Sequence, residues 1–576
     1  MNKLPIEFQK PHYSDFKDFF ADIATRYSGK EAFILKKKVK KEITYTSVSY
    51  DQFCLDVKAV ATALLNLGYE NKKIAIIGDN SYNWLLAYYA TLAGVGIVIP
   101  LDKGLTFEET LSSITRSEAD ILFFDDGHLE TAKKIQDEHS TTVNLFVNLN
   151  SSTDFIELET IKSQGLELIN NGSTAYDEKV IDKDEVTILL FTSGTTSMSK
   201  IVALTQQNIL SNLYALQSSE FIFEGERSLA LLPLHHTFGS TGTLLMLASG
   251  VSTAFCDGLK YINKNLIEYK ISVFFCVPLL IESIYKKIMT KVKKEGKEKT
   301  FNTMIKLTRF LLKFKIDIRR KVFASIHEQL GGHLRLLITG ASAIDKKALE
   351  CFLDLGIVAV QGYGLTETSP VVSAENNNNI RIGSVGKAMC NVDIKINEPN
   401  SEGIGDVFVK GPNVMVGYYQ NQEETDKVFV DGWFNTGDLG YIDKDGFLFL
   451  SGRSKNVVVL KNGKNVYPEE IELLISSLPY VAENFVFGMP KADDETDLIL
   501  GVKIVYNGEY IKTTYGDIST EDLEKIIKND IDKINETMPH YKNLIRVIIT
   551  DEPMIKTSTA KVKRHEEIEL IKRHFK

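Results

Sequence analysis

A hydroxyl-rich stretch with a single lysine, FTSGTTSMSK, occupies residues 191–200 directly after the apolar run TILL. Its Thr and Ser side chains and its backbone N–H groups could hold the β- and γ-phosphates of a nucleotide. A Walker A loop is excluded, because that motif needs a glycine directly before the lysine and a hydroxyl directly after it. The chain has Ser199 and Ile201 at those places. A polar strand-to-helix turn is the alternative for this stretch taken alone.

Two further motifs carry groups that suit the rest of a nucleotide. In QGYGLTET (361–368), Tyr363 can lie flat against a purine, Thr366 offers a hydroxyl to phosphate, and Glu367 offers a carboxylate to Mg²⁺. In the segment 433–453, Asp438 could bind both ribose hydroxyls and Arg453 could hold the same sugar or a phosphate. A turn aspartate is the alternative for Asp438.

The elements that position these motifs alternate between short apolar runs and helix-compatible stretches. Runs such as KIAIIGDN (73–80) and LRLLITGA (334–341) end in glycine or polar residues. This alternation predicts the α/β class with layered, largely parallel sheets, which bind ligands at the carboxyl ends of their strands. After about Gly452 the pattern changes, and an amphipathic helix is expected over 520–537. We therefore expect a smaller C-terminal α+β domain; the polar ENNNN at 375–379 is expected to be a surface loop.

The composition is that of a globular enzyme with more than one domain. The 576 residues exceed what one hydrophobic core usually serves, and the net charge of -9 argues against nucleic acid as a bulk partner. Five cysteines show no metal-ligand spacing, which is typical of a reduced chain without structural zinc. The N-terminus lacks the apolar stretch of a signal peptide, so we expect a cytoplasmic protein.

One uncharged stretch, residues 84–101, is long enough to suggest a membrane span. Gly94, Gly96 and Pro100 divide it. Because these residues interrupt a helix, we expect a helix that turns into a short buried strand.

Taken together, these motifs resemble the adenylate-forming superfamily of acyl-CoA synthetases, luciferases and peptide-synthetase adenylation domains. The resemblance runs from ITYTSVSY (43–50) to KTSTAKVKR (556–564), with the motifs in family order. It implies a large N-terminal AMP- and acyl-binding domain, residues 1–453, and a small mobile C-terminal lid domain, residues 454–576.

The resemblance also implies roles for individual residues. It assigns Tyr363 to adenine, Thr366 to the α-phosphate region, Glu367 to Mg²⁺, and Asp438 with Arg453 to ribose. The flexible phosphate loop would comprise Thr192, Ser193, Gly194, Thr195, Thr196 and Lys200. The strand ends that border the nucleotide would supply Gly340, Ala341, Gln361, Gly362 and Gly364.

Four more residues are assigned by motif. His236 in LPLHHTFG matches the position that lines the carboxylate end of the acyl pocket, although a buried core histidine is the alternative. Lys455 in GRSKN matches the hinge before the lid. Lys561 matches the catalytic lysine that bridges the carboxylate and the α-phosphate, with a solvated basic tail as the alternative. Gly463 would let the pantetheine arm of CoA approach the backbone closely.

The implied reaction is ATP-dependent conversion of a carboxylic acid to an acyl-adenylate, followed by transfer to the thiol of CoA. The segments PLDKGLT (100–106) and LKNGKNVYPEEIE (460–472) most resemble the long-chain fatty acyl-CoA branch, so a long-chain fatty acid is favoured. Two alternatives stay open. The acceptor could be a separate acyl carrier protein. A degenerate nucleotide- or acyl-adenylate-binding regulatory protein would fit the irregular loop, where Ser197, Ser199 and Ile201 replace the usual glycine, proline and glycine.

A basic segment suggests a further partner. Residues 286–321 hold fourteen Lys and Arg against three Asp and Glu, with Phe310, Leu311, Leu312 and Phe314 interleaved. Such a segment could lie on the anionic inner face of a membrane. A solvated charged helix hairpin is the alternative.

Overall fold

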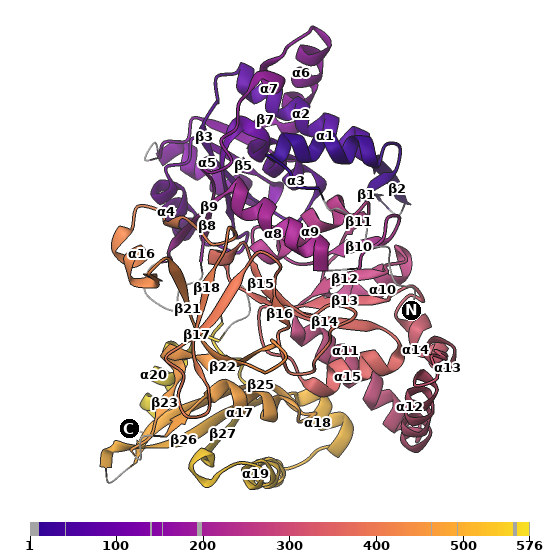
Figure 1. Ribbon diagram of the computed structural model, residues 1–576, viewed down its shortest axis with the longest axis vertical. Helices are drawn as coiled ribbons and strands as arrows, with labels where there is room; N and C mark the ends of the chain where they lie inside the picture. The colour runs from indigo at the N-terminus through magenta and orange to yellow at the C-terminus, as the bar shows by residue number, and fades with distance from the viewer. Residues whose placement is uncertain are drawn as a thin grey trace.

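The computed structural model describes residues 11–40, 42–138, 141–151, 154–192, 199–219, 221–461, 464–491, 494–556 and 562–574. Over these ranges the chain forms a large region of layered sheets and helices, followed by a smaller C-terminal unit of sheet and helix (Figure 1). The predicted α/β class is confirmed.

A nine-stranded sheet crosses the middle of the large region. Its central strands are parallel, and antiparallel strands close both edges. Its order is β16 (Lys387–Ala388), β15 (Val371–Ala374), β14 (Val358–Gly364), β13 (Leu336–Thr339), β12 (Val273–Cys276), β10 (Arg227–Ala230), β11 (Ser252–Phe255), β1 (Glu31–Val39) and β2 (Glu42–Ser49). The motif around Tyr363 therefore lies at the carboxyl end of β14, beside the end of β13.

An eight-stranded sheet carries the hydroxyl-rich stretch. Its order is β19 (Gly417–Tyr418), β9 (Ile201–Thr205), β8 (Val186–Phe191), β4 (Gly96–Leu101), β3 (Lys72–Ile77), β5 (Ile121–Phe124), β6 (Leu145–Asn148) and β7 (Ile156–Glu157). Strands β8, β4, β3 and β5 pair in parallel and their apolar residues are mostly buried on both faces, which explains their continuous hydrophobic runs. Strands β8 and β9 pair antiparallel, so the stretch 191–200 leads into a second strand, and the alternative of a strand-to-helix turn does not hold.

A third, antiparallel sheet holds the ribose motif. It pairs β17 (Asp393–Asn397), β18 (Gly405–Lys410), β21 (Trp433–Ile442) and β20 (Phe429–Val430), with β22 (Leu448–Arg453) beside β21. The β21–β22 pairing places Asp438 directly opposite Arg453.

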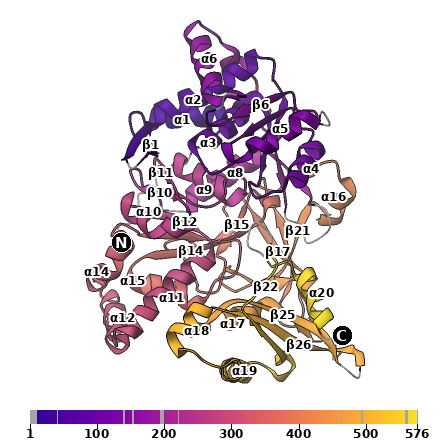
Figure 2. The ribbon, with the colours of Figure 1, turned by 180° about the vertical axis from the view of Figure 1, so that it is seen from behind.

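The C-terminal unit has a core of its own. Strands β25 (Val481–Lys491), β26 (Asp494–Tyr506) and β27 (Leu544–Thr550) form its sheet, covered by α17 (Pro468–Ser476) and α19 (Thr520–Glu536) (Figure 1 and Figure 2). Helix α19 matches the predicted amphipathic helix and buries Leu523, Ile527 and Ile531 at intervals of four residues. These side chains belong to a cluster of buried residues that runs from Val458 to Leu544.

The uncharged stretch 84–101 folds as predicted. Helix α3 (Tyr82–Ala90) leads through a turn over Thr91–Val95 into strand β4. Gly96 packs against the backbone of Lys72, where a side chain would collide with the carbonyl oxygen. None of the helices in the described ranges is both long and apolar enough to cross a bilayer.

Candidate functional site

The base of the β8–β9 hairpin holds the first and last residues of the proposed phosphate loop. The backbone N–H of Thr192 donates to the carbonyl oxygen of Lys200 at 2.9 Å, and the Thr192 hydroxyl donates to the same oxygen at 3.3 Å. The loop residues between them, Ser193, Gly194, Thr195 and Thr196, lie outside the described residues. Thr192 and Lys200 thus fix both ends of a loop at the carboxyl end of β8.

Lys200 is held by two partners that the sequence did not indicate. Its Nζ lies 2.5 Å from Oε2 of Glu424 on α16 (Gln422–Val428), and 4.4 Å from the centre of the Tyr418 ring. The hydrogen bond from Lys200, aided by Lys427, lowers the pKa of Glu424 to about 2. The Lys200 cation therefore lies between a carboxylate and an aromatic face.

Tyr418 connects this lysine to the proposed magnesium ligand. Its hydroxyl donates to Oε1 of Glu367 at 3.0 Å, and burial together with the Glu367 charge raises the pKa of Tyr418. Strand β19 brings Tyr418 there because it pairs with β9, with Tyr418 opposite Val202. Glu367 itself lies in a short turn, Thr366–Thr368, that follows β14. The contact thus joins the ends of two different sheets.

The Glu367 carboxylate has the character of a magnesium ligand. Its second oxygen, Oε2, makes no hydrogen bond or ion pair with any residue in the described ranges. In nucleotide sites Mg²⁺ is usually held by one or two carboxylates together with substrate phosphates, so a single half-buried carboxylate is sufficient. In the described part of the chain, no group of three or more His, Cys, Asp or Glu side chains forms a metal cage. The residues present fit Mg²⁺ bound jointly with ATP.

Three of the residues proposed for adenine and ribose are in direct contact. The Tyr363 hydroxyl donates to Oδ2 of Asp438 at 2.6 Å, and Nε of Arg453 lies 2.7 Å from Oδ1 of the same carboxylate. Tyr363 and Asp438 are buried, whereas Arg453 is exposed. Burial, and secondarily the Asp438 charge, raises the pKa of Tyr363. The first and third sheets are thereby joined through one hydrogen-bonded carboxylate.

Glycines near the ends of β13 and β14 let neighbouring backbone segments approach one another closely. A side chain at Gly340 would come within 2.8 Å of the Gly362 carbonyl oxygen, and one at Gly364 within 1.7 Å of the Pro370 carbonyl oxygen. Ala341 has a φ of 74°, in the left-handed region that disfavours side chains. The ends of β13 and β14 are therefore fixed tightly against each other.

Gln361 is buried and bonded within the protein. Its N–H donates to Oε2 of Glu375 at 3.1 Å and its side-chain amide to the Ser384 carbonyl oxygen at 3.2 Å. Glu375 is fully buried, and this desolvation raises its pKa to about 7 although it also accepts the Arg381 N–H. The prediction of a surface loop was wrong for Glu375, because backbone N–H groups satisfy both of its carboxylate oxygens. Gln361 and Glu375 thus support the strand ends from within the core.

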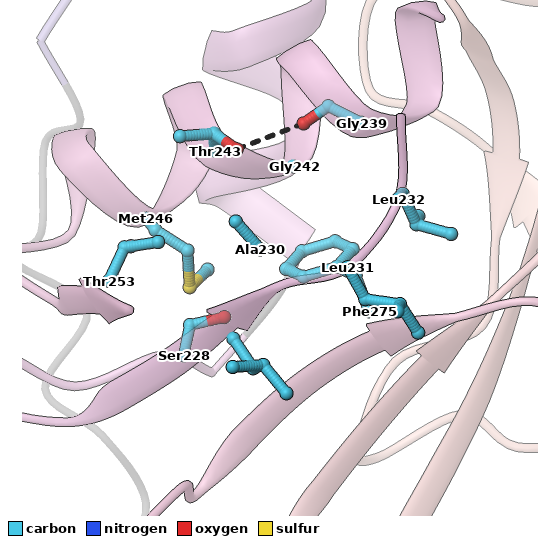
Figure 3. Close-up of a pocket in the computed structure, with 11 residues that line it drawn as sticks. Ser228, Ala230, Leu231, Leu232, Gly239, Gly242, Thr243, Met246, Thr253 and Phe275 are labelled. Atoms are coloured by element: carbon cyan, nitrogen blue, oxygen red, sulfur yellow. Dashed lines mark hydrogen bonds between the residues drawn. The ribbon is translucent and has the colours of Figure 1, made fainter. Parts of the chain in front are cut away.

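His236 stands directly before α9 (Thr237–Ala248) and is not among the residues that line a small cavity behind that helix. It is half-buried, and its Nδ1 lies 3.5 Å from the Phe238 N–H nitrogen. Behind α9 a free volume of about 10 Å³, room for one water molecule, separates the helix from β10, β11 and β12 (Figure 3). Met246 from α9 and Phe275 from β12 both point into it (Figure 3). The cavity is lined mainly by apolar groups.

The junction to the C-terminal unit is an exposed turn. Lys455 is exposed and lies in the turn Ser454–Asn456, after β22. On one side, the Ser454 hydroxyl donates to Asp406 of the third sheet at 2.8 Å. On the other side, the Asn456 amide donates to Glu469 of α17 at 2.6 Å. Lys455 thus lies between a residue bonded to the large region and one bonded to the C-terminal unit.

Two predicted residues, Gly463 and Lys561, lie outside the described residues. Lys556 and Val562, the nearest described residues on either side of Lys561, pair in an antiparallel bridge. Lys556 Nζ also lies 2.6 Å from Glu483 of β25.

Comparison with known families and structures identifies the class of protein. A family model described as AMP-binding enzyme matches residues 20–419, and one described as AMP-binding enzyme C-terminal domain matches residues 455–573. The first match covers more than half of the chain. The chain therefore belongs to the AMP-binding enzyme family of AMP-forming acyl ligases.

Curated relatives span most of the chain. A long-chain-fatty-acid–CoA ligase of Mycobacterium bovis is 26% identical, over 90% of each chain. Long-chain-fatty-acid–CoA ligase 5 of Rattus norvegicus is 27% identical, over 91% of this chain and 82% of the relative. A chloroplastic long-chain-fatty-acid–[acyl-carrier-protein] ligase of Arabidopsis thaliana is 25% identical, over 90% of this chain and 80% of the relative.

Solved structures share the fold. The anthranilate CoA ligase AuaEII in complex with anthranoyl-AMP superimposes with a TM-score of 0.75, at 18% identity and over 97% of this chain and 98% of that one. ATP-bound MatB from Rhodopseudomonas palustris superimposes with a TM-score of 0.74, at 23% identity and over 98% of this chain and all of that one.

Proposed function

We propose that this chain is a long-chain fatty acid:CoA ligase that forms AMP and pyrophosphate. The observation that carries the proposal is the convergence of the nucleotide motifs. Tyr418 joins Lys200 to Glu367, and Asp438 joins Tyr363 to Arg453. The long-chain-fatty-acid ligases among its relatives support the choice of acid.

The first half-reaction removes two obstacles to acylation. A carboxylate is anionic and its oxygen leaves badly, so it reacts poorly with a thiol. A carboxylate oxygen of the acid attacks the α-phosphorus of ATP in line, a P–O bond forms, and the bond to pyrophosphate breaks. When ATP binds, Lys200 leaves its ion pair with Glu424 and contacts a phosphate oxygen of ATP. Thr366 and Lys561 face the α-phosphate and the attacking carboxylate. The two lysine cations and the Thr366 hydroxyl donor at these points stabilise the negative charge of the transition state.

Glu367, with the ATP phosphates, would hold Mg²⁺. When bound, this ion offsets negative charge on the phosphate oxygens. Asp438 and Arg453 hold the ribose, and Tyr363 with the strand ends borders the adenine. The Tyr363 hydroxyl keeps the buried Asp438 carboxylate in one orientation, because it satisfies one oxygen while Arg453 satisfies the other.

The second half-reaction needs access for a thiol. We propose that residues 1–453 and 454–576 are separate domains and that rotation at Lys455 withdraws Lys561 and presents the segment with Gly463 to the site. The separate core of the C-terminal unit and the bonds on either side of Lys455 support this division. The CoA thiolate then attacks the acyl carbonyl carbon, the thioester forms, and AMP leaves.

The acyl chain has a candidate site behind α9, the helix that follows His236. The cavity behind α9 is too small for a fatty acyl chain as it stands, since it has room for about one water molecule. A long-chain acid would therefore have to displace the Met246 or Phe275 side chain. Methionine has three rotatable bonds and adapts readily to such a change.

A carrier protein is the second candidate acceptor, favoured by the acyl-carrier-protein ligase among the relatives. The test is to incubate the enzyme with ATP, Mg²⁺ and either CoA or a phosphopantetheine-bearing carrier protein. Fatty acids of increasing length, aromatic acids and amino acids are compared. We expect AMP and acyl-CoA in equal amounts with long-chain acids. Transfer to the carrier alone would replace CoA as the acceptor; nucleotide binding without turnover on any acid would favour the regulatory alternative.

Lys200→Met and Lys427→Met test the phosphate site with a matched control. Both lysines pair with Glu424, Lys200 at 2.5 Å and Lys427 at 2.7 Å, but only Lys200 stands at the base of the phosphate loop. Lys200→Met should lower the rate of adenylation about 100-fold, as loss of one transition-state donor does. Lys427→Met should leave it unchanged. Equal effects of the two substitutions would contradict the assignment.

A further inference from the structure

The outer edge of the large region is formed by α12 (Glu298–Leu312), which follows α11 (Pro278–Lys294). Figures 1 and 2 show α12 at the periphery, and Figure 1 shows α13 (Arg319–Val322) beside it. Its inner side is buried through Phe301 and Thr308, and the Phe301 ring packs 5.5 Å from that of Phe323. The inner side therefore anchors the helix to the protein.

The outer side of α12 and the turn after it are apolar and exposed. Leu307, Phe310, Phe314 and Ile316 are 43%, 55%, 63% and 50% exposed, and we name these four residues the α12 patch. Leu307 and Phe310 are neighbours on one face because they lie three positions apart. The Phe310 and Phe314 rings meet edge to face at 5.2 Å. Adjacent apolar side chains at this exposure mark an interaction surface.

Unpaired cations surround the α12 patch. Lys299, Lys306, Lys313 and Lys315 are exposed, and none of them forms an ion pair with a residue in the described ranges. Between residues 286 and 321 the chain carries fourteen Lys and Arg against three Asp and Glu, in a protein whose net charge is -9. The positive charge is therefore concentrated where the apolar side chains protrude.

We propose that the α12 patch docks the protein on an anionic lipid bilayer. Phe310 and Phe314 would enter the boundary between headgroups and acyl chains, and the lysines would contact the lipid phosphates. A second copy of the chain fits less well, because it would bring the same lysines together. This proposal does not depend on the identity of the acid.

The test is co-sedimentation of the full chain with vesicles. Vesicles of phosphatidylcholine alone are compared with vesicles that also contain phosphatidylglycerol, at low and at high salt. We expect binding only to the anionic vesicles, and weaker binding at high salt because ions screen the lysines. Phe310→Ser/Phe314→Ser and Lys306→Glu/Lys313→Glu should each weaken binding at least tenfold.

The matched control is Val180→Ser/Leu259→Ser, which removes two apolar side chains that are 85% and 77% exposed outside the patch. It should bind as the wild type does, and thermal melting should show all variants folded. Absence of wild-type binding to anionic vesicles would overturn the proposal, as would Phe310→Ser/Phe314→Ser binding equal to wild type. Binding to an acidic carrier protein but not to vesicles would overturn it in favour of a protein partner.

Discussion

Tyr418→Phe tests the link between the phosphate loop and the proposed magnesium ligand. The substitution removes one hydroxyl group, which donates to Oε1 of Glu367 at 3.0 Å, and keeps the ring that lies 4.4 Å from Lys200 Nζ. The cation–ring contact therefore stays while the carboxylate loses the partner that orients it.

The size of the effect follows from the role of that partner. Loss of an outer-shell hydrogen bond to a metal ligand typically weakens metal binding about 10- to 100-fold. Glu367 is half-buried, so water can replace part of the lost hydrogen bond and we expect the lower end, about tenfold. A factor of ten corresponds to about 1.4 kcal/mol. The Mg²⁺ concentration for half-maximal rate should rise by this factor, with a smaller change in the maximal rate.

The assay is acid-dependent exchange of labelled pyrophosphate into ATP, titrated with Mg²⁺. Tyr419→Phe is the matched control, because the Tyr419 hydroxyl contacts Lys73 at 2.8 Å and Glu118 at 3.0 Å, away from the site. It should titrate as the wild type does. An unchanged Mg²⁺ dependence in Tyr418→Phe, or an equal shift in Tyr419→Phe, would refute the reasoning.

Three further predictions concern single side chains. Asp438→Asn should raise KM for ATP about tenfold, because a neutral amide keeps only one acceptor for Tyr363 and Arg453 and weakens the ribose site. Initial-rate kinetics at saturating acid measure this KM, and an unchanged value would contradict the prediction. The pKa of Glu375 is about 7 in the folded protein, above the usual 4.5. Between these two pH values the folded protein therefore keeps a proton on Glu375 that the unfolded chain has lost. The free energy of unfolding should fall by about 3 kcal/mol as pH rises from 4.5 to 7 and stay low above it, whereas Glu375→Gln should remove this fall in urea titrations. Lys561→Ala should abolish adenylation yet spare thioester formation from supplied acyl-AMP, and loss of both steps in a folded variant would mean that the lysine is misassigned.

Local patterns in the sequence predicted much of the fold. The alternation of apolar runs and helices follows from which faces are buried, so it indicated the α/β class and the helix that became α19. The stretch 84–101 was predictable because glycine and proline interrupt helices regardless of tertiary context. The phosphate-loop and Tyr363 motifs were recognisable because each follows an apolar run, whereas Asp438 lies within a strand, β21.

The contacts between those motifs were not predictable from local patterns. Tyr418 reaches Lys200 and Glu367 only because a two-residue strand, β19, pairs with β9, and so short a strand leaves no periodic signal. Glu424 has the appearance of an ordinary solvated helix residue. Glu375 begins a polar run typical of a surface loop, and its burial depends on N–H groups supplied by residues Gln361 and Arg381.

The central claim is that one site forms an acyl-adenylate from ATP and a long-chain acid and then passes the acyl group to CoA. The most direct measurement is a single-turnover experiment with labelled fatty acid, quenched before and after addition of CoA. We predict that acyl-AMP accumulates without CoA, and that CoA converts it to acyl-CoA and AMP in equal amounts. Formation of ADP and phosphate in place of AMP and pyrophosphate, or acyl-CoA without acyl-AMP, would contradict the account.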